Sequence, residues 1–242
     1  MKKMLVGILC LTAARALAEH WTYDGEHGPE YWSRLSPEYA TCGDGKRQSP
    51  IDIRGAEKAD LPPIAFAYTP SRLKIVDNGH TIQVNYAPGS SITVGNKKYE
   101  LVQFHFHKPS EESVNGRHSA MVAHLVHKDA DGKLAVVAVL LEEGASNPLI
   151  ETLWKHLPAE KENEVAVEGV EIDASTLLPR GRGYYTFDGS LTTPPCSEGV
   201  TWFVLETPTQ VSQAEVSEFG TRYAHNARPT QPVNGRVVRQ SR

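Results

Sequence analysis

Short β-type runs, separated by turn-forming residues, restrict the fold of this sequence more than any other feature. The runs are rich in β-branched and alternating apolar residues, and Gly, Pro, Asn or Asp residues lie between them. They comprise residues 64–68, 75–76, 81–86, 91–94, 100–108, 120–128, 134–141 and 201–206. Apolar residues at helical spacing are found mainly at residues 148–156 and 213–224. The pattern predicts a mostly β (α+β) protein with one mostly antiparallel sheet and short peripheral helices.

The length of the chain fits a single domain. At 242 residues it can bury one large core, and no linker rich in Ser, Gly or Pro divides it. Hydrophobic residues make up 40% and charged residues 22%, an ordinary balance that excludes extensive disorder. There is no internal repeat, and the strand spacing is too irregular for a propeller.

The N-terminal segment has the pattern of a cleaved signal peptide. Lys2 and Lys3 precede an apolar stretch at residues 4–14, and Ala16-Leu17-Ala18 supplies a small-x-small cleavage site. The alternative is a membrane anchor, but the apolar stretch is well below the ~20 residues that span a bilayer. We predict that residues 1–18 are removed and that residues 19–242 form a mature domain without a membrane span. Such a domain would be periplasmic or secreted.

Charge and cysteine content describe the mature chain further. Cleavage removes three basic residues and no acidic one, so the formal net charge goes from −4 to −7 and no nucleic-acid surface is indicated. Cys10 leaves with the signal peptide, and Cys42 and Cys196 remain in an oxidising compartment. We expect a disulfide between these two residues. The alternative is two separate buried thiols.

The segment Gln103-Phe104-His105-Phe106-His107 carries the most chemical information. Because side chains alternate along a strand, Gln103, His105 and His107 share one face. His124 lies in another β-type run, and a neighbouring antiparallel strand could bring it beside them. Three neutral imidazoles without a fourth protein ligand form an open zinc site, which is usually catalytic. With ten histidines in the chain, the alternative for any single one is a core or surface side chain.

These histidines and the residues that follow them resemble the alpha-type carbonic anhydrases, especially the exported bacterial members. The histidine segment is followed by Pro109-Ser110-Glu111 and then by His124-Leu-Val-His127. The resemblance covers nearly the whole mature chain and continues, in family order, through Trp21-Thr-Tyr23, Gly28-Pro-Glu-Tyr-Trp32, Gln48-Ser-Pro-Ile51, Asn78-Gly-His80, Ser190-Leu-Thr-Thr-Pro-Pro195 and Asn226-Ala-Arg-Pro-Thr-Gln-Pro232. It implies a large twisted central sheet of about ten strands, near the upper end of the usual range. It also implies Zn²⁺ at the bottom of a conical cleft with one apolar and one polar wall.

The resemblance implies a role for each residue of the centre. His105, His107 and His124 would be the zinc ligands, and Gln103 would accept a hydrogen bond from the first of them. Zinc lowers the pKa of its bound water to about 7, carbonic anhydrase being the established example, and the hydroxide attacks carbon dioxide. The products are bicarbonate and a proton.

Two further residues would orient the hydroxide. Thr192 would accept its hydrogen bond and donate to Glu111. The alternatives are an ordinary turn for Thr192 and Thr193, which precede two prolines, and a solvated loop charge for Glu111.

Substrate contacts and proton removal also follow from the resemblance. His80 would be the proton shuttle, because an imidazole with a pKa near 6.5 can relay a proton at neutral pH. A turn residue is the alternative for His80, and Tyr23 and Gln83 would order the intervening water. Carbon dioxide would lie against Val126, Val136, Leu191, Thr193 and Trp202. The alternative is core packing for the four apolar residues and an ordinary turn for Thr193.

Three positions depart from the family pattern. Members usually have histidine where Glu112 stands, glutamate where Val122 stands and tyrosine where Phe187 stands. That glutamate accepts the outer hydrogen bond of the third zinc histidine, and such losses typically cost about 10–100-fold in metal affinity or activity. We therefore hypothesise that Glu112 has taken over this role toward His124, with Phe187 filling the space of the tyrosine.

Reversible hydration of carbon dioxide is the function that this resemblance implies. A carbonic-anhydrase-like binding module without catalysis is the alternative from another class, and a zinc esterase is a third possibility. Sulfonamide-type inhibitors are expected to bind, and a homodimer is plausible by resemblance to the exported bacterial members.

Overall fold

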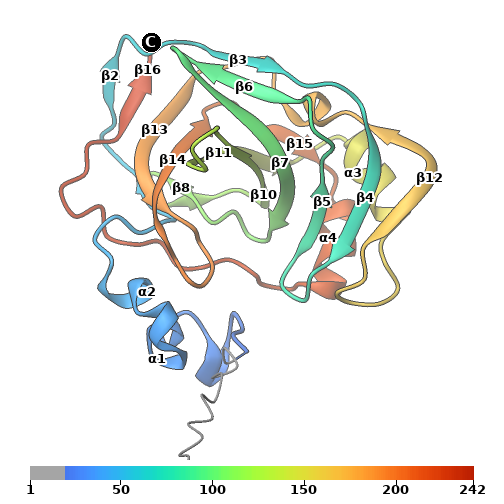
Figure 1. Cartoon of the computed structure of the whole chain (residues 1–242), viewed down its shortest axis with the longest axis horizontal. Coiled ribbons are helices and arrows are strands. Elements are labelled where there is room, and N and C mark those ends of the chain that lie inside the picture. Colours follow the sequence, from blue (N-terminus) through green and yellow to red (C-terminus); the bar gives the residue numbers. More distant parts are fainter. Residues whose placement is uncertain (1–19) are drawn as a thin grey trace, which may run out of the picture.

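The computed structural model describes residues 20–242 (Figure 1). The predicted signal peptide, residues 1–18, lies outside the described residues, as does Glu19. Strands dominate the fold and the helices are short and peripheral, so the predicted fold class is confirmed. In this described part of the chain, no helix is both long and apolar enough to cross a membrane.

A 13-stranded mixed sheet forms the body of the molecule. Ten of its strands follow one another in hydrogen-bonded order: β12 (Val165–Ile172), β4 (Ser71–Asp77), β5 (Ile82–Asn85), β7 (Lys97–His107), β10 (Met121–Lys128), β11 (Leu134–Glu143), β14 (Glu198–Leu205), β13 (Tyr184–Ser190), β16 (Arg239–Ser241) and β2 (Glu57–Ala59). Three more join at the sides: β3 (Ile64–Ala67), β6 (Ser91–Val94) and β15 (Thr209–Val211). Most pairings are antiparallel, but β11 pairs in parallel with β14 and β15, and β16 pairs in parallel with β2.

The remaining elements are small. A separate sheet contains β1 (Asp52–Ile53), β8 (Ser113–Val114) and β9 (Arg117–His118). The helices are η1 (Gly25–His27), α1 (Trp32–Leu35), η2 (Pro37–Tyr39), α2 (Thr41–Asp44), α3 (Pro148–Trp154), η3 (Ala174–Leu177) and α4 (Gln213–Arg222). Figure 1 shows β7, β10 and β11 in the middle of the twisted sheet, with α3 and α4 to one side and α1 and α2 below it.

Strand β7 has the alternation that its sequence predicts. Phe104 and Phe106 are fully buried in the main core cluster, which also contains residues of α3 and α4. Phe106 makes edge-on ring contacts with Trp154 and Phe219, at centroid distances of 5.2 and 6.4 Å. Because this face of β7 is fixed by packing, the opposite face presents its histidines in one defined direction.

Side chains at the N-termini hold these two helices in place. Asn147 caps α3 by accepting hydrogen bonds from the backbone of Leu149 and Ile150. Ser212 and Glu215 form a capping box at the start of α4. Both helices therefore begin at a residue whose side chain satisfies otherwise unpaired N–H groups.

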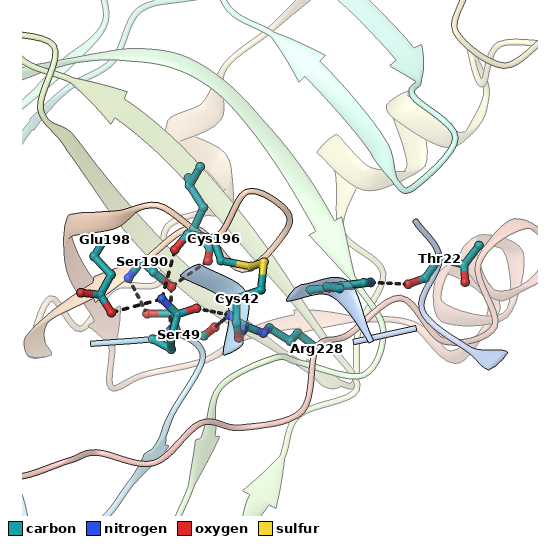
Figure 2. The surroundings of a disulfide bond; sticks show 10 residues. Thr22, Cys42, Ser49, Ser190, Cys196, Glu198 and Arg228 are labelled. Carbon is teal, nitrogen blue, oxygen red and sulfur yellow. Dashed lines mark hydrogen bonds between the residues drawn. A yellow bond between two sulfur atoms is a disulfide. The ribbon is translucent and has the colours of Figure 1, made fainter. Parts of the chain in front are cut away.

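The predicted disulfide between Cys42 and Cys196 is present, and it joins α2 to the loop between β13 and β14 (Figure 2). Its half-cystines pack in a small cluster with the buried Trp32. Arg228 crosses the same region and donates hydrogen bonds from Nη2 to the carbonyl of Cys42 and from Nη1 to the carbonyl of Ser49. The N-terminal region is thus tied to the segment that contains Thr192 and Thr193.

Candidate metal centre

Strand register brings the three histidines together. β7 and β10 are antiparallel, and His124 is the direct partner of His105 while Val122 is the partner of His107. Directly paired residues lie on the same face of a sheet, so the three imidazoles point to one side. Their ring centroids lie 4.7–5.4 Å apart. One potential ligand atom from each histidine lies within 4.8 Å of the other two.

The outer nitrogen of each imidazole has its own hydrogen-bond acceptor. His105 Nδ1 lies 2.9 Å from Gln103 Oε1, and His107 Nδ1 lies 2.8 Å from the carbonyl oxygen of Asn226. His124 uses its other nitrogen, because its Nε2 lies 3.1 and 3.2 Å from the two carboxylate oxygens of Glu112. These bonds leave Nε2 of His105, Nε2 of His107 and Nδ1 of His124 to face the shared space.

Burial favours the neutral form of two of the imidazoles. It lowers the pKa of His105 to about 3, with a smaller effect of His124. Burial also lowers the pKa of His107 well below its ordinary value. At His124, burial acts in the same direction, but the carboxylates of Glu112 and Glu111 outweigh it and raise the pKa. A cluster of neutral or carboxylate-supported imidazoles is a donor set that suits Zn²⁺.

Glu111 is a fully buried carboxylate beside this cluster. Its Oε1 accepts a hydrogen bond of 2.8 Å from the backbone N–H of Arg228. Its Oε2 lies 3.5 Å from His107 Nε2 and 3.8 Å from His124 Nδ1. Burial raises the pKa of Glu111 to about 7, against the opposing influence of His124.

The two threonines lie differently. Thr192 is buried and Thr193 is half-buried. Among the described residues Glu111 Oε2 has no hydrogen-bond partner, so the hydrogen bond from Thr192 to Glu111 stays a prediction. Thr193, His105 and His107 line a cavity of about 130 Å³, together with Trp21, Tyr23, Asn78, His80, Thr81, Gln83 and Gln103.

Three of the four apolar residues expected to contact substrate lie in strands beside the histidines, and Leu191 packs against the same core cluster as they do. Val126 pairs with Val136 across β10 and β11, and Val136 pairs with Trp202 across β11 and β14. Val136 and Trp202 are nearly fully buried, whereas Val126 and Leu191 are half-buried. The Trp202 ring makes an edge-on contact with His124 at 5.0 Å. The row therefore forms an apolar wall next to the cluster, in which Val126 and Leu191 are the more accessible members.

His80 lies at the edge of the cavity under an aromatic cover. The ring of Trp21 stacks on it with centroids 3.6 Å apart and an interplanar angle of 8°. Burial lowers the pKa of His80 to about 4, and the charges of His20 and Lys161 act in the same direction. The pKa of His80 in this stacked position therefore lies below the expected value near 6.5, because burial disfavours the charged imidazole.

Asn226 has a central position that sequence reasoning did not assign. Besides the carbonyl that bonds to His107, its side-chain Nδ2 donates to the carbonyl oxygens of His80 and Phe106, each at 3.0 Å. Its Oδ1 accepts from the backbone N–H of Lys108 at 2.8 Å. The only sequence signal was the block Asn226-Ala-Arg-Pro, which resembles a family segment without indicating a role.

Comparisons with known proteins agree with this geometry. Residues 27–242 match the family model described as eukaryotic-type carbonic anhydrase. The carbonic anhydrase of Pectobacterium carotovorum is 42% identical over 231 residues, which cover 95% of this chain and 94% of that protein.

Two solved structures are similar over nearly their full length. The alpha-carbonic anhydrase of Thermovibrio ammonificans, in complex with the inhibitor sulfanilamide, has a TM-score of 0.87 and 43% identity and covers 93% of this chain and 99% of its own. A hyperthermostable carbonic anhydrase from a hydrothermal vent chimney has a TM-score of 0.89 and 44% identity, and covers 92% of this chain and 100% of its own.

Proposed function

Because this chain belongs to the alpha, or eukaryotic-type, carbonic anhydrase family and is a carbonate dehydratase, we propose that it hydrates carbon dioxide reversibly at its three-histidine centre with Zn²⁺ as the cofactor. The observation that carries the proposal is the convergence of His105, His107 and His124 within 4.8 Å. Their side chains offer three nitrogen ligands, and no acidic or sulfur ligand is included in the group. This donor set leaves one zinc position open, as catalytic zinc requires.

The structure also has a polar atom that a metal would satisfy. In the described part of the chain, the buried Nε2 of His107 has no hydrogen-bond partner. Zinc, when bound, would lower the pKa of a water molecule to about 7 and so supply hydroxide at neutral pH, carbonic anhydrase being the established example of this effect. The residues therefore fit the metal in number, type and orientation.

Glu111 and Thr192 would orient the attacking hydroxide. A carboxylate can only accept hydrogen bonds, so Glu111 would fix the Thr192 hydroxyl as a donor toward itself. The lone pairs of the Thr192 oxygen would then be free to accept a hydrogen bond from the hydroxide and so orient it. Glu111 is fully buried and its Oε2 accepts no hydrogen bond from the described residues, so this oxygen is available to the Thr192 hydroxyl.

Carbon dioxide would bind against the wall formed by Val126, Val136, Leu191 and Trp202, with Thr193 on the polar side. The substrate is apolar and bicarbonate is charged, so an apolar wall favours the reactant over the product. The reaction would join a hydroxide oxygen to the carbon of the substrate, and the wall residues would release the charged bicarbonate. Thr193 lines the cavity, and its hydroxyl would hydrogen-bond to the oxygens of bicarbonate.

His80 would carry the proton from the cavity to solvent. It lines the cavity together with Gln83 and Tyr23, whose polar groups can order a chain of water molecules. In the position stacked on Trp21 its pKa is about 4, too low for efficient transfer at neutral pH. We infer that the imidazole works when it leaves this stack, where its pKa returns toward about 6.5.

A stopped-flow hydration assay with a pH indicator tests the proposed activity. The zinc-loaded protein should hydrate carbon dioxide, lose the activity when a chelator removes the metal, and regain it when one equivalent of zinc is added. A sulfonamide such as sulfanilamide should inhibit it, as the Thermovibrio complex leads us to expect. Zinc-loaded protein that binds sulfanilamide but does not accelerate hydration would instead favour a binding module without catalysis. A zinc esterase activity on activated esters would be a side reaction with the same metal dependence.

Export completes the proposal. The N-terminal segment and the disulfide both support a periplasmic or secreted enzyme. N-terminal sequencing of the protein after expression with its leader should give Glu19 as the first residue. A homodimer is a further prediction from the resemblance, which sedimentation analysis would test.

A further inference from the structure

The three imidazoles of the centre do not have equivalent partners. Gln103 and Asn226 offer uncharged oxygens to His105 and His107, whereas Glu112 offers a carboxylate to His124. Both carboxylate oxygens lie within hydrogen-bond distance of the same atom, His124 Nε2, at 3.1 and 3.2 Å. The third histidine is therefore the only one of the cluster whose outer nitrogen bonds to a charged residue.

Glu112 is committed to this single contact. Its side chain is 0% exposed, and within residues 20–242 its carboxylate has no hydrogen bond or ion pair except those to His124. The hydroxyl of Ser110 bonds to the backbone carbonyl of Glu112 and not to its side chain. A buried carboxylate without a partner is strongly unfavourable, so the contact with His124 must account for its presence there.

The neighbours of His124 on β10 and in its aromatic packing offer Nε2 no other acceptor, and Glu111 lies near Nδ1 instead. Val122, two residues earlier on the same face of β10, is fully buried and has no polar side-chain atom. Phe187 is also buried, and its ring stacks parallel to that of Trp202 at 6.2 Å. Trp202 in turn packs edge-on against His124. The imidazole is held by aromatic packing on one side and by a single carboxylate at its outer nitrogen.

We propose that Glu112 is the positioning residue of the third metal ligand in this protein. Its carboxylate holds the proton of His124 on Nε2. The lone pair of Nδ1 is then directed toward the metal, and dissociation of the metal is slowed. Glu112 and Val122 form one coupled pair, because the carboxylate comes from the loop after β7 while the position on β10 that could supply one is apolar. The inference rests on the proposed zinc function.

The first test is the rate at which zinc leaves the protein into excess chelator. Glu112→Gln keeps the size of the side chain and removes its charge, and it should speed zinc loss about 10–100-fold. The matched control is Glu215→Gln, which changes another buried carboxylate, at the start of α4 and outside the metal centre. The rate of zinc loss from the control should stay within about twofold of the rate for the unmodified protein, although the thermal stability of the control falls. Equal rates of zinc loss for the two variants would overturn the proposal.

A second variant tests the coupling. In Glu112→Gln/Val122→Glu, a carboxylate is supplied from β10 instead. Zinc should leave this double variant at least about tenfold more slowly than it leaves Glu112→Gln, which matches the smaller end of the 10–100-fold effect expected above. Val122→Glu alone should weaken zinc retention, because two like charges would then compete for one imidazole. A double variant that loses zinc as fast as Glu112→Gln would contradict the coupled pair.

Spectroscopy of the unmodified protein gives a readout that does not depend on the variants folding. With ¹⁵N-labelled histidine, His124 of the zinc-loaded protein should show a protonated Nε2 in slow exchange with water and an Nδ1 without a proton. A proton on Nδ1 of the zinc-loaded protein, with Nε2 unprotonated, would overturn the inference. Failure of the proposed function is distinguishable, because it would appear as absent zinc retention or absent hydration in the unmodified protein itself.

Discussion

Burial of ionisable side chains determines the chemistry of single residues in this protein. His80 and Glu111 both have pKa values moved by loss of water, downward to about 4 for the imidazole and upward to about 7 for the carboxylate. At His80 the stacked side chain is Trp21, which can be removed without touching the metal ligands, while the ring of His20 lies further away at 5.5 Å. The effect of the Trp21 side chain can therefore be measured directly.

We predict that Trp21→Ala raises the pKa of His80 from about 4 toward about 6.5. The reason is that burial is the largest cause of the lowered value. The measurement is an NMR titration of the imidazole carbon-bound protons. Tyr31→Ala, which removes an exposed aromatic side chain, should leave the titration unchanged. An unshifted midpoint in Trp21→Ala would assign the lowered pKa to the neighbouring charges instead.

The same pKa predicts the direction of a pH effect on stability. Between pH about 6.5 and about 4 the unfolded chain binds a proton at His80 that the folded chain does not. The free energy of unfolding should therefore fall as the pH is lowered through this window. In urea unfolding of the metal-free protein, His80→Gln should lose less stability than the unmodified protein between pH 7 and pH 4. Equal losses in the two proteins would exclude His80 as a contributor.

Strand β7 is the element on which the centre depends most. The residues on each of its faces could be predicted from the sequence, because Phe and His alternate along it. The eight predicted runs correspond to β3, β4, β5, β6, β7, β10, β11 and β14, and the two helical segments correspond to α3 and α4. Five strands of the large sheet were not predicted: β2, β12, β13, β15 and β16. β12 has exposed glutamates and an interior glycine, and β13 contains Asp188 and Gly189. Such residues are uncommon in strands, so these two segments give a weak strand signal and form strands because distant parts of the chain pair with them.

Substitution on the buried face of β7 should disturb the histidines on the other. We predict that Phe106→Ala lowers the free energy of unfolding by about 3–5 kcal/mol, because it removes a fully buried ring packed against Trp154 and Phe219. Zinc should also dissociate faster. Val102→Ala in the same strand, where the side chain is 39% exposed, should cost well under about 1 kcal/mol. Denaturant unfolding checks both values, and similar losses would contradict the packing account.

Connections between residues far apart in the sequence fix the N-terminal region to the rest of the molecule. The disulfide joins residues separated by 154 positions, and Arg228 bonds to the same region from near the C-terminus. The sequence predicted the disulfide from the two cysteines of the mature chain. It could not predict the backbone contacts of Asn226 and Arg228, because a carbonyl or an N–H group has no signal in residue identity.

The variant Cys42→Ser/Cys196→Ser should therefore be less stable by about 2–5 kcal/mol. Thermal unfolding measures the loss. Treatment of the unmodified protein with a reductant is the matched comparison, and it should lower the melting temperature by a similar amount. A variant as stable as the oxidised protein would show that packing around Trp32 holds this region without the disulfide.

The central claim is that three imidazoles hold one metal ion, and a zinc-soaked crystal measured at the zinc absorption edge tests it most directly. We predict one strong anomalous peak at about 2.0–2.1 Å from Nε2 of His105, Nε2 of His107 and Nδ1 of His124, with water as the fourth ligand. A peak bound to any other set of residues, or no peak at these histidines, would contradict the account.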